Sequence, residues 1–299
     1  MQCAKKFEVR LTYMKNAAVI NMHKKRIAKQ GIKLGLVYIG LFIIALWAVF
    51  PLLWMVQISL KEPVLAYNPS VWIFKPVIDN YTNVFADKNF DKFFVNSVVV
   101  TIFNTILALV LGTTAAYGFS RFKFKYADAC LFFLLVIRMV PSVAIVIPVF
   151  LIGSFMHLID TRILLIVTYL IFNVPFVAWM MKGFFDEIPK ELDEAAMVDG
   201  CTTMQSLYKV ILPMVLPGIV ATSIFCVISS WNEFVYALFL TSIHSVTTPT
   251  IVQSFLSIVG VVWGEMSAVG TMAVFPVLIF AMIVQKHMIR GLTFGAVKG

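Results

Sequence analysis

Four polar side chains interrupt the apolar stretches of this 299-residue sequence, and they are the first candidates for chemistry. Arg138 and Glu233 are ionisable, and Asn173 and Asn232 carry amides. Ionisable groups inside apolar segments are costly and usually functional. Arg138 can line a cavity and donate to the hydroxyls or phosphate of a solute, or it can pair with Glu233 or a backbone carbonyl. Glu233 can instead lie at the outer end of its segment, and the amides can bond neighbouring helices.

The sequence carries no pattern of an established catalytic or nucleotide-binding site. The motifs G-x-x-x-x-G-K-[ST], H-E-x-x-H and G-x-S-x-G are absent, so the chain itself cannot cradle the phosphates of ATP. The four cysteines contain no C-x-x-C pair, and the four histidines are scattered. We therefore predict no catalytic residue, no metal site and no cofactor bound by this chain.

The composition predicts that membrane-spanning helices position the polar residues. Hydrophobic residues make up 61% of the chain and charged residues 13%, and the mean hydropathy is +0.92, whereas soluble domains contain roughly 25% charged residues. Six apolar stretches reach the about 17–25 residues that a spanning helix needs. They lie at about 34–60, 93–117, 128–152, 161–182, 213–240 and 266–286. We expect an all-α integral membrane protein with one membrane domain, residues 34–290.

Basic residues predict the orientation of the helices. Nine of the 24 Lys and Arg lie in residues 1–33, directly before the first apolar stretch, and basic flanks resist translocation. Both chain ends are therefore expected in the cytoplasm, together with the 183–213 loop and the 291–299 tail, while 61–92 and 241–265 lie outside. We interpret the basic segment 1–33 as a topogenic signal for insertion in the cell membrane. The net charge of +9 therefore does not indicate a nucleic-acid partner.

The 183–213 loop differs from the rest of the chain because it is acidic. Pro189 suits the first position of a helix, and the acids that follow favour the positive end of the helix dipole. Gly200 suits the stop of that helix. The loop therefore begins with a short helix.

A second short helix is predicted after the glycine. Thr202 and Gln205 match a capping box for a helix at 206–211. The two helices would form an elbow, and Ala195 and Ala196 leave one face small enough for another protein to approach closely. The alternative is an amphipathic linker on the bilayer surface, although such linkers are usually basic.

The spacing in this loop resembles the EAA signature of permeases of ATP-binding-cassette (ABC) importers. Glu194-Ala195-Ala196 is followed by Gly200 after three residues, and by Val210-Ile211-Leu212-Pro213 after nine more, with valine where the signature has isoleucine. Five further stretches resemble the carbohydrate branch of this family, the maltose and glycerol-phosphate type. They are Asn80-Tyr81, Asn96-Ser97, 116–121, 231–234 and 295–299.

The resemblance implies a function and a set of partners. The elbow would be the coupling helix that contacts a separate ATPase, which uses ATP and Mg²⁺. The contacting residues would be Glu194, Ala195, Ala196, Asp199, Gly200, Leu212 and Pro213.

The chain would then be a non-enzymatic permease for a sugar or sugar-like solute in a bacterial or archaeal membrane. It would act with a second, homologous permease, two ATPase copies and an extracytoplasmic solute-binding protein. Arg138, Asn173, Asn232 and Glu233 would be candidates for the translocation path. The alternative is an ion-coupled secondary transporter, for which only Glu233 is a credible buried carboxylate.

Overall fold

The chain forms two compact units in the computed structural model, Met1–Gln57 and Ile58–Gly299. The described residues are 33–122, 124–257 and 260–293. Nearly all of the predicted N-terminal segment 1–33, and residues 294–299 of the predicted tail, lie outside them.

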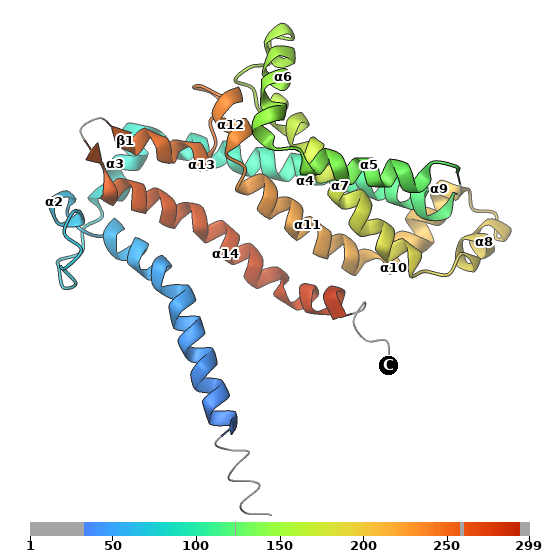
Figure 1. Ribbon diagram of the computed structural model, residues 1–299, viewed down its shortest axis with the longest axis horizontal. Coiled ribbons are helices and arrows are strands. Elements are labelled where there is room, and N and C mark those ends of the chain that lie inside the picture. The colour runs from blue at the N-terminus through green and yellow to red at the C-terminus, as the bar shows by residue number, and fades with distance from the viewer. Residues whose placement is uncertain (1–32, 123, 258–259, 294–299) are drawn as a thin grey trace, which may run out of the picture. The chain divides into compact units, whose positions relative to one another are not determined.

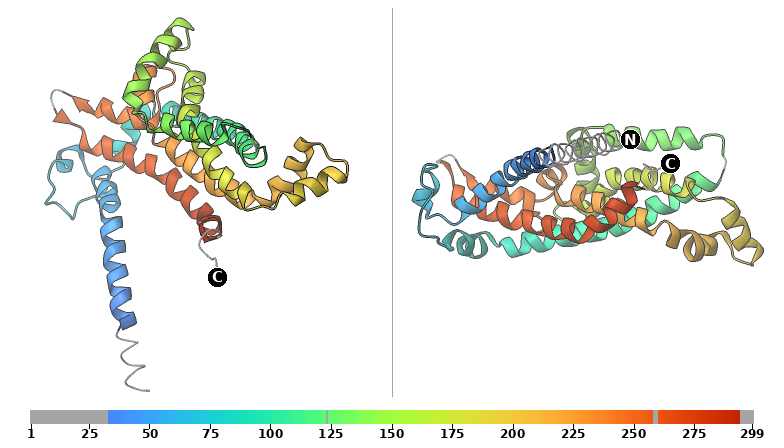
Figure 2. Two further views of the ribbon diagram at one scale, coloured as in Figure 1. Left: turned by 45° about the vertical axis from the view of Figure 1, so that its right-hand side comes forward. Right: turned by 90° about the horizontal axis from the view of Figure 1, so that it is seen from below.

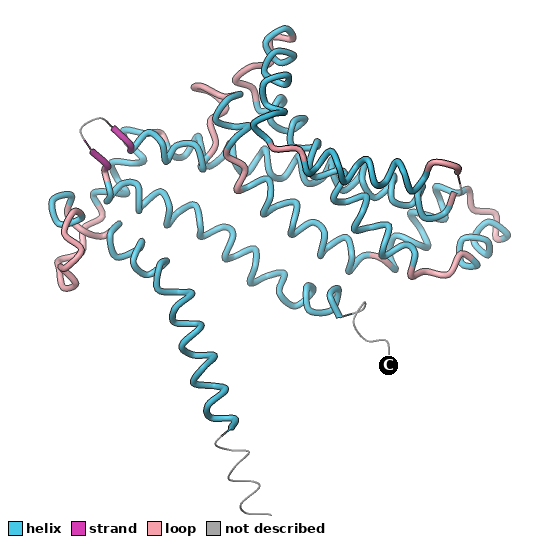
Figure 3. The backbone as a smooth tube through the Cα atoms, in the orientation of Figure 1, coloured by secondary structure: helices cyan, strands magenta, loops and turns pink. Residues whose placement is uncertain are grey.

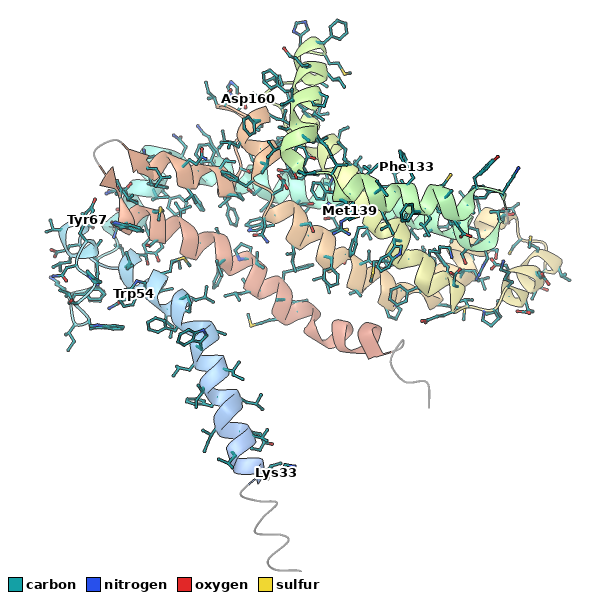
Figure 4. The ribbon with its side chains drawn as sticks, in the orientation of Figure 1. Lys33, Trp54, Tyr67, Phe133, Met139 and Asp160 are labelled. Carbon is teal, nitrogen blue, oxygen red and sulfur yellow. The ribbon has the colours of Figure 1, made fainter. Side chains whose placement is uncertain are left out.

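One apolar helix makes up the described part of the first unit. It runs over Lys33–Ser59, so its last two residues belong to the second unit. Figure 4 labels Lys33 and Trp54 on this helix, and the ring of Trp54 lies 5.9 Å from that of Phe50. A helix of 27 residues is about 40 Å long, which is enough to cross about 30 Å of hydrocarbon. The predicted span 34–60 is therefore confirmed as a helix.

The second unit is helical apart from one short strand pair in its described part, as Figure 3 shows. The strands β1 and β2 are antiparallel, with Leu256 opposite Val261. The elements in chain order are α2 (Pro63–Ala66), α3 (Asp79–Lys88), α4 (Phe90–Arg121), α5 (Ala127–Met139), α6 (Ser142–Phe155), α7 (Arg162–Asp186), α8 (Glu191–Val198), α9 (Thr203–Ser206), the π-helical turn η1 (Leu207–Ile211), α10 (Leu212–Met214), α11 (Leu216–Trp231), α12 (Val235–Leu240), α13 (Thr248–Ile251), the 3₁₀ turn η2 (Val252–Phe255), β1 (Leu256–Ser257), β2 (Gly260–Val261) and α14 (Trp263–Thr293).

The helices confirm the all-α membrane class. Four helices of the described chain are long and apolar enough to cross a bilayer: the first helix, α4, α7 and α14. Two further pairs of helices, each bent sharply at a break, raise the number to six if each pair is one span.

The third predicted span, 128–152, is one of these broken pairs. Helix α5 ends at Met139 and α6 begins at Ser142, and the two axes differ by 93° (Figure 1). Pro141 explains the break because proline disfavours helical backbone in the residue before it, and Val140 has φ −67° and ψ 129°. The predicted span is therefore helical in two pieces, and it counts as one span if this bent pair crosses the bilayer as a unit.

The fifth predicted span, 213–240, is also interrupted. Helix α11 ends at Trp231, and α12 begins only at Val235. Helix α11 also lies at 82° to the Thr203–Met214 segment before it. Asn232 and Glu233, which the sequence placed inside a span, therefore lie in a break between helices.

Helices α4 and α7 form the most extensive helix pair of the second unit, and α11 packs against α4 and α14. Gly112 permits the close approach, because a Cβ at this position would lie 2.5 Å from Cβ of Val177. Small residues serve the same purpose between membrane helices generally. Figures 1 and 2 show α8 and α9 at one end of α4, with α3 and β1 at the other.

Candidate functional site

The acidic loop, 183–213, contains the predicted elbow, which follows the end of α7. Gly200 follows α8 with φ +88°, a conformation that strains residues with a Cβ. The predicted capping box is confirmed: Thr202 N–H donates to Gln205 Oε1 at 2.9 Å, and Gln205 N–H donates to Thr202 Oγ1 at 3.3 Å. Helix α8 begins at Glu191 instead of Pro189. Pro189 lies in the preceding turn.

The second arm of the elbow differs from the prediction of a short helix at 206–211. Helix α9 ends at Ser206, and a π-helical turn occupies Leu207–Ile211. Both Leu207 and Ile211 are buried in the core beside α4 and α7. Residues four apart share one face of a helix, and here that face packs into the core. Turns of the π type are frequent at functional sites.

The elbow exposes most of the residues predicted to contact the ATPase. Glu194, Ala195, Asp199, Gly200 and Pro213 are exposed, whereas Ala196 is buried and Leu212 is half-buried. Four large apolar side chains are also exposed on the elbow, and Val198 reaches 87%. They are Met197, Val198, Met204 and Tyr208. Exposed apolar groups beside acids are suited to contact another protein.

A buried carboxylate attaches the elbow to α4. Asp193 Oδ2 accepts a hydrogen bond from Arg121 Nε at 2.6 Å. Its Oδ1 accepts from the hydroxyls of Tyr117 at 2.7 Å and Ser206 at 2.9 Å. No local pattern in the sequence predicted this cluster, although Tyr117 and Arg121 belong to the 116–121 stretch that carries a family resemblance.

Arg138 lies near the end of α5 and is exposed. Its guanidinium carbon lies 4.4 Å from the ring centre of Phe176, a cation–π arrangement. No ion pair joins Arg138 to Glu233 among the described residues. The two ionisable residues of the predicted path are therefore not brought together.

Glu233 and Asn232 lie in the break between α11 and α12. Glu233 is half-buried, and its Oε1 accepts the N–H of Tyr236 at 3.0 Å, so this carboxylate caps the start of α12. Asn232 is exposed, and its amide donates to the carbonyl of Ile228 at 3.0 Å. Of these two side chains, Asn232 is the more accessible.

Asn173 forms a buried polar junction between three helices. Its amide donates to Asn104 Oδ1 on α4 at 2.6 Å and to Ser230 Oγ on α11 at 2.8 Å. The Asn173 side chain is 1% exposed, and it makes the interhelical hydrogen bonds that polar residues in spans commonly make.

Asp160 clamps the turn between α6 and α7 to the loop after α12 (Figure 4). It has φ +60°, and the backbone N–H groups of residues 242–245 all donate to its carboxylate at 2.9–3.1 Å. Burial alone raises the pKa of the Asp160 carboxyl, but the four backbone donors outweigh burial and hold its pKa below the ordinary value. The clamp therefore keeps its negative charge at neutral pH.

Asp160→Asn should speed amide hydrogen exchange at 242–245 by roughly tenfold or more, because each hydrogen bond to a charged group contributes about 1.5–3 kcal/mol. In the wild type the folded pKa lies below the unfolded value of about 3.9, so the stabilisation is complete above that value and is lost only as pH falls through the folded pKa. We expect flat protection of these amides between about pH 5 and 8. Protection that declined within that window, after correction for intrinsic exchange, would contradict the clamp.

The described part of the chain contains no group of three or more His, Cys, Asp or Glu that could hold a metal ion.

Comparisons with known proteins agree with the geometry. A family model described as "Binding-protein-dependent transport system inner membrane component" matches residues 108–294. The chain is 36% identical to a probable ABC transporter permease protein of Sinorhizobium fredii, with 86% of this chain and 92% of that protein covered. It is 31% identical to the trehalose/maltose transport system permease protein of Thermococcus litoralis, with 88% and 96% covered.

A solved structure shares the fold. It is that of a bacterial ABC transporter involved in the import of the acidic polysaccharide alginate, with a TM-score of 0.70 and 22% identity. The match covers 83% of this chain and 93% of the other.

Proposed function

Because the chain belongs to the family of binding-protein-dependent transport system inner membrane components, we propose that it moves a sugar or sugar-like solute inward by ATP-driven alternating access. It is a membrane-spanning permease subunit of an ABC importer. The relatives whose names mention trehalose, maltose and alginate support a carbohydrate as the solute class.

The partners are proposed from the architecture of such importers. Two copies of a cytoplasmic ATPase would bind and hydrolyse MgATP, so this chain would need no cofactor of its own. A second, homologous permease would complete the pathway as a heterodimer within the lipid bilayer. An extracytoplasmic binding protein would deliver the solute.

The exposed elbow is the observation that carries the ATPase contact. It combines an exposed Glu194, the bend at Gly200 and an exposed apolar rim that includes Val198. When a partner covers apolar side chains of this size, their removal from water favours binding. We propose that the exposed residues among those predicted for coupling, including Asp199 and Pro213, lie at this contact.

The translocation path is proposed to include the accessible polar groups in the membrane. Arg138 and Asn232 are exposed, and Glu233 lies next to Asn232. Asn173 would contribute indirectly, by holding α4, α7 and α11 together. Arg138→Gln should lower uptake of labelled trehalose or maltose without changing the amount of co-purified ATPase. Unchanged uptake would remove Arg138 from the path.

The experiment is purification of the tagged chain in mild detergent from the cells that make it. We expect a co-purifying polypeptide that hydrolyses MgATP and is inhibited by vanadate. The chain alone, reconstituted in liposomes, should take up neither labelled trehalose nor labelled maltose. Uptake by the chain alone, driven by a proton or sodium gradient, would contradict the proposal and favour an ion-coupled carrier.

A further inference from the structure

The buried pair Arg121–Asp193 connects helix α4 to helix α8 of the elbow. Both side chains are nearly inaccessible, with exposures of 7% and 6%. The same guanidinium donates from Nη1 to the carbonyl of Phe185 at 3.0 Å, near the end of α7. One side chain of α4 therefore holds the end of α7 and the middle of α8 together.

The pair differs from the other charges of the elbow. Glu191, Glu194 and Asp199 are exposed, so solvent screens them. Lys182 and Asp186 form the neighbouring ion pair at 2.6 Å, but their side chains are 24% and 45% exposed. Removal of one partner from a buried pair leaves a charge uncompensated, whereas exposed pairs contribute little. Only Arg121–Asp193, of these charges, therefore restrains the elbow strongly.

The covalent connection between α7 and α8 is a weaker restraint. Residues 187–190 form turns and irregular backbone between the two helices. Such a segment can change its dihedral angles when a partner pulls on α8. The cluster of Tyr117, Arg121, Asp193 and Ser206, which we name the elbow latch, joins α8 and α9 to α4 without that segment.

We propose that Arg121 and Asp193 are positioning residues, and that the elbow latch makes α4 and the elbow move as one body during transport. This inference rests on the proposed docking of an ATPase at the elbow. A movement of the elbow would then pass directly to α4. Because α4 packs along α7, the movement would continue into the membrane domain.

The experiment places spin labels on the two parts that the latch joins. Glu191→Cys on α8 and Leu111→Cys on α4 are exposed positions, used in a background without the native cysteines. Distances between the labels are measured in the purified complex, without nucleotide and with MgATP plus vanadate. Asp193→Asn removes the charge at nearly constant shape, and Lys182→Gln removes the exposed pair as a matched control.

In the unmodified latch we expect one narrow distance distribution that MgATP and vanadate leave unchanged. In Asp193→Asn the distribution of label distances should be broad and should shift when MgATP and vanadate are added. In Lys182→Gln the distribution should match that of the unmodified protein. If Asp193→Asn does not accumulate in membranes, Arg121→Lys takes its place, because lysine keeps the charge but cannot bond Asp193 and the Phe185 carbonyl together as the guanidinium does. Identical distributions in the latch variant and the unmodified protein would overturn the proposal.

The two hypotheses fail in different ways. If no ATPase co-purifies with the unmodified chain, the proposed function fails, and the comparison without nucleotide still decides whether the latch fixes the elbow. If an ATPase co-purifies and the latch variant keeps a narrow, unshifted distribution, the importer assignment stands and the role of Arg121 and Asp193 is rejected.

Discussion

Gly200→Val should lower the amount of ATPase that co-purifies with the permease and lower sugar uptake in parallel. Gly200 has φ +88°, and no neighbouring atom lies within 4 Å of where a Cβ would be. The expected effect is therefore backbone strain and not a steric clash. Left-handed backbone costs residues with a Cβ about 1–2 kcal/mol, and more when they are β-branched. If strain displaces the elbow from its docking geometry, this corresponds to about 5- to 30-fold weaker binding.

Two controls separate strain from other effects of the substitution. Gly200→Asn adds a larger side chain but tolerates left-handed backbone, so it should keep most of the association. Gly183→Ala changes a glycine in α7 that has ordinary helical backbone, and a Cβ there would meet no atom within 4 Å, so this variant should be neutral. Equal losses in Gly200→Val and Gly200→Asn would show that the left-handed backbone is not what matters.

Gly112→Val should destabilise the membrane domain more than any other single glycine replacement in α4. Its side chain would overlap Val177 Cβ at 2.5 Å and Cγ1 at 2.7 Å, and the carbonyl of Val174 lies at 3.1 Å. Overpacking of this kind typically costs about 1–3 kcal/mol, and here a rigid helix backbone opposes relaxation. Thermal unfolding in detergent should show a lower midpoint, and uptake should fall with it.

The matched control for this helix pair is Gly118→Ala. Gly118 lies in the same helix, α4, and a Cβ there meets no atom within 4 Å. Alanine forms helix better than glycine by about 1 kcal/mol, so this variant should be unchanged or slightly more stable. The substitution matched to it is Gly112→Ala, which already adds the Cβ that meets Val177. Equal stability of Gly112→Ala and Gly118→Ala would argue against close packing of α4 on α7 at Gly112.

Local signals made the elbow predictable from the sequence. The Thr202–Gln205 capping box acts over three residues, and the left-handed glycine ends the helix directly before it. The membrane class followed from composition, because long apolar stretches have few alternatives to a spanning helix. These features needed no knowledge of tertiary packing.

The breaks in the spans and the elbow latch depended on tertiary structure. Pro141 predicted a kink, but proline alone does not distinguish a kink within one helix from a 93° bend between two helices. Asp193 and Glu194 look alike in the sequence, yet the first is buried and the second exposed. The partner of Asp193 lies 72 residues away, at Arg121. Hydrophobic pattern carries no information on such a pairing.

The contacts of Asp160 also depend on tertiary structure. A single aspartate in a loop between spans resembles an ordinary solvated residue. Its role depends on φ +60° and on four consecutive N–H groups that lie more than 80 residues later in the chain. Only the folded arrangement of the two loops brings these groups together.

Site-specific photocrosslinking tests the central claim most directly. A benzophenone amino acid at Val198, which is 87% exposed on the elbow, should crosslink to the MgATP-hydrolysing subunit in intact membranes. The same group at Ile73, which is 95% exposed in the segment predicted to lie outside, should not. Crosslinking of Val198 to that ATPase alone is the result we predict. Val198 that crosslinks only to lipid, or an ATPase captured equally from Ile73, would contradict the assignment of the elbow as the coupling site.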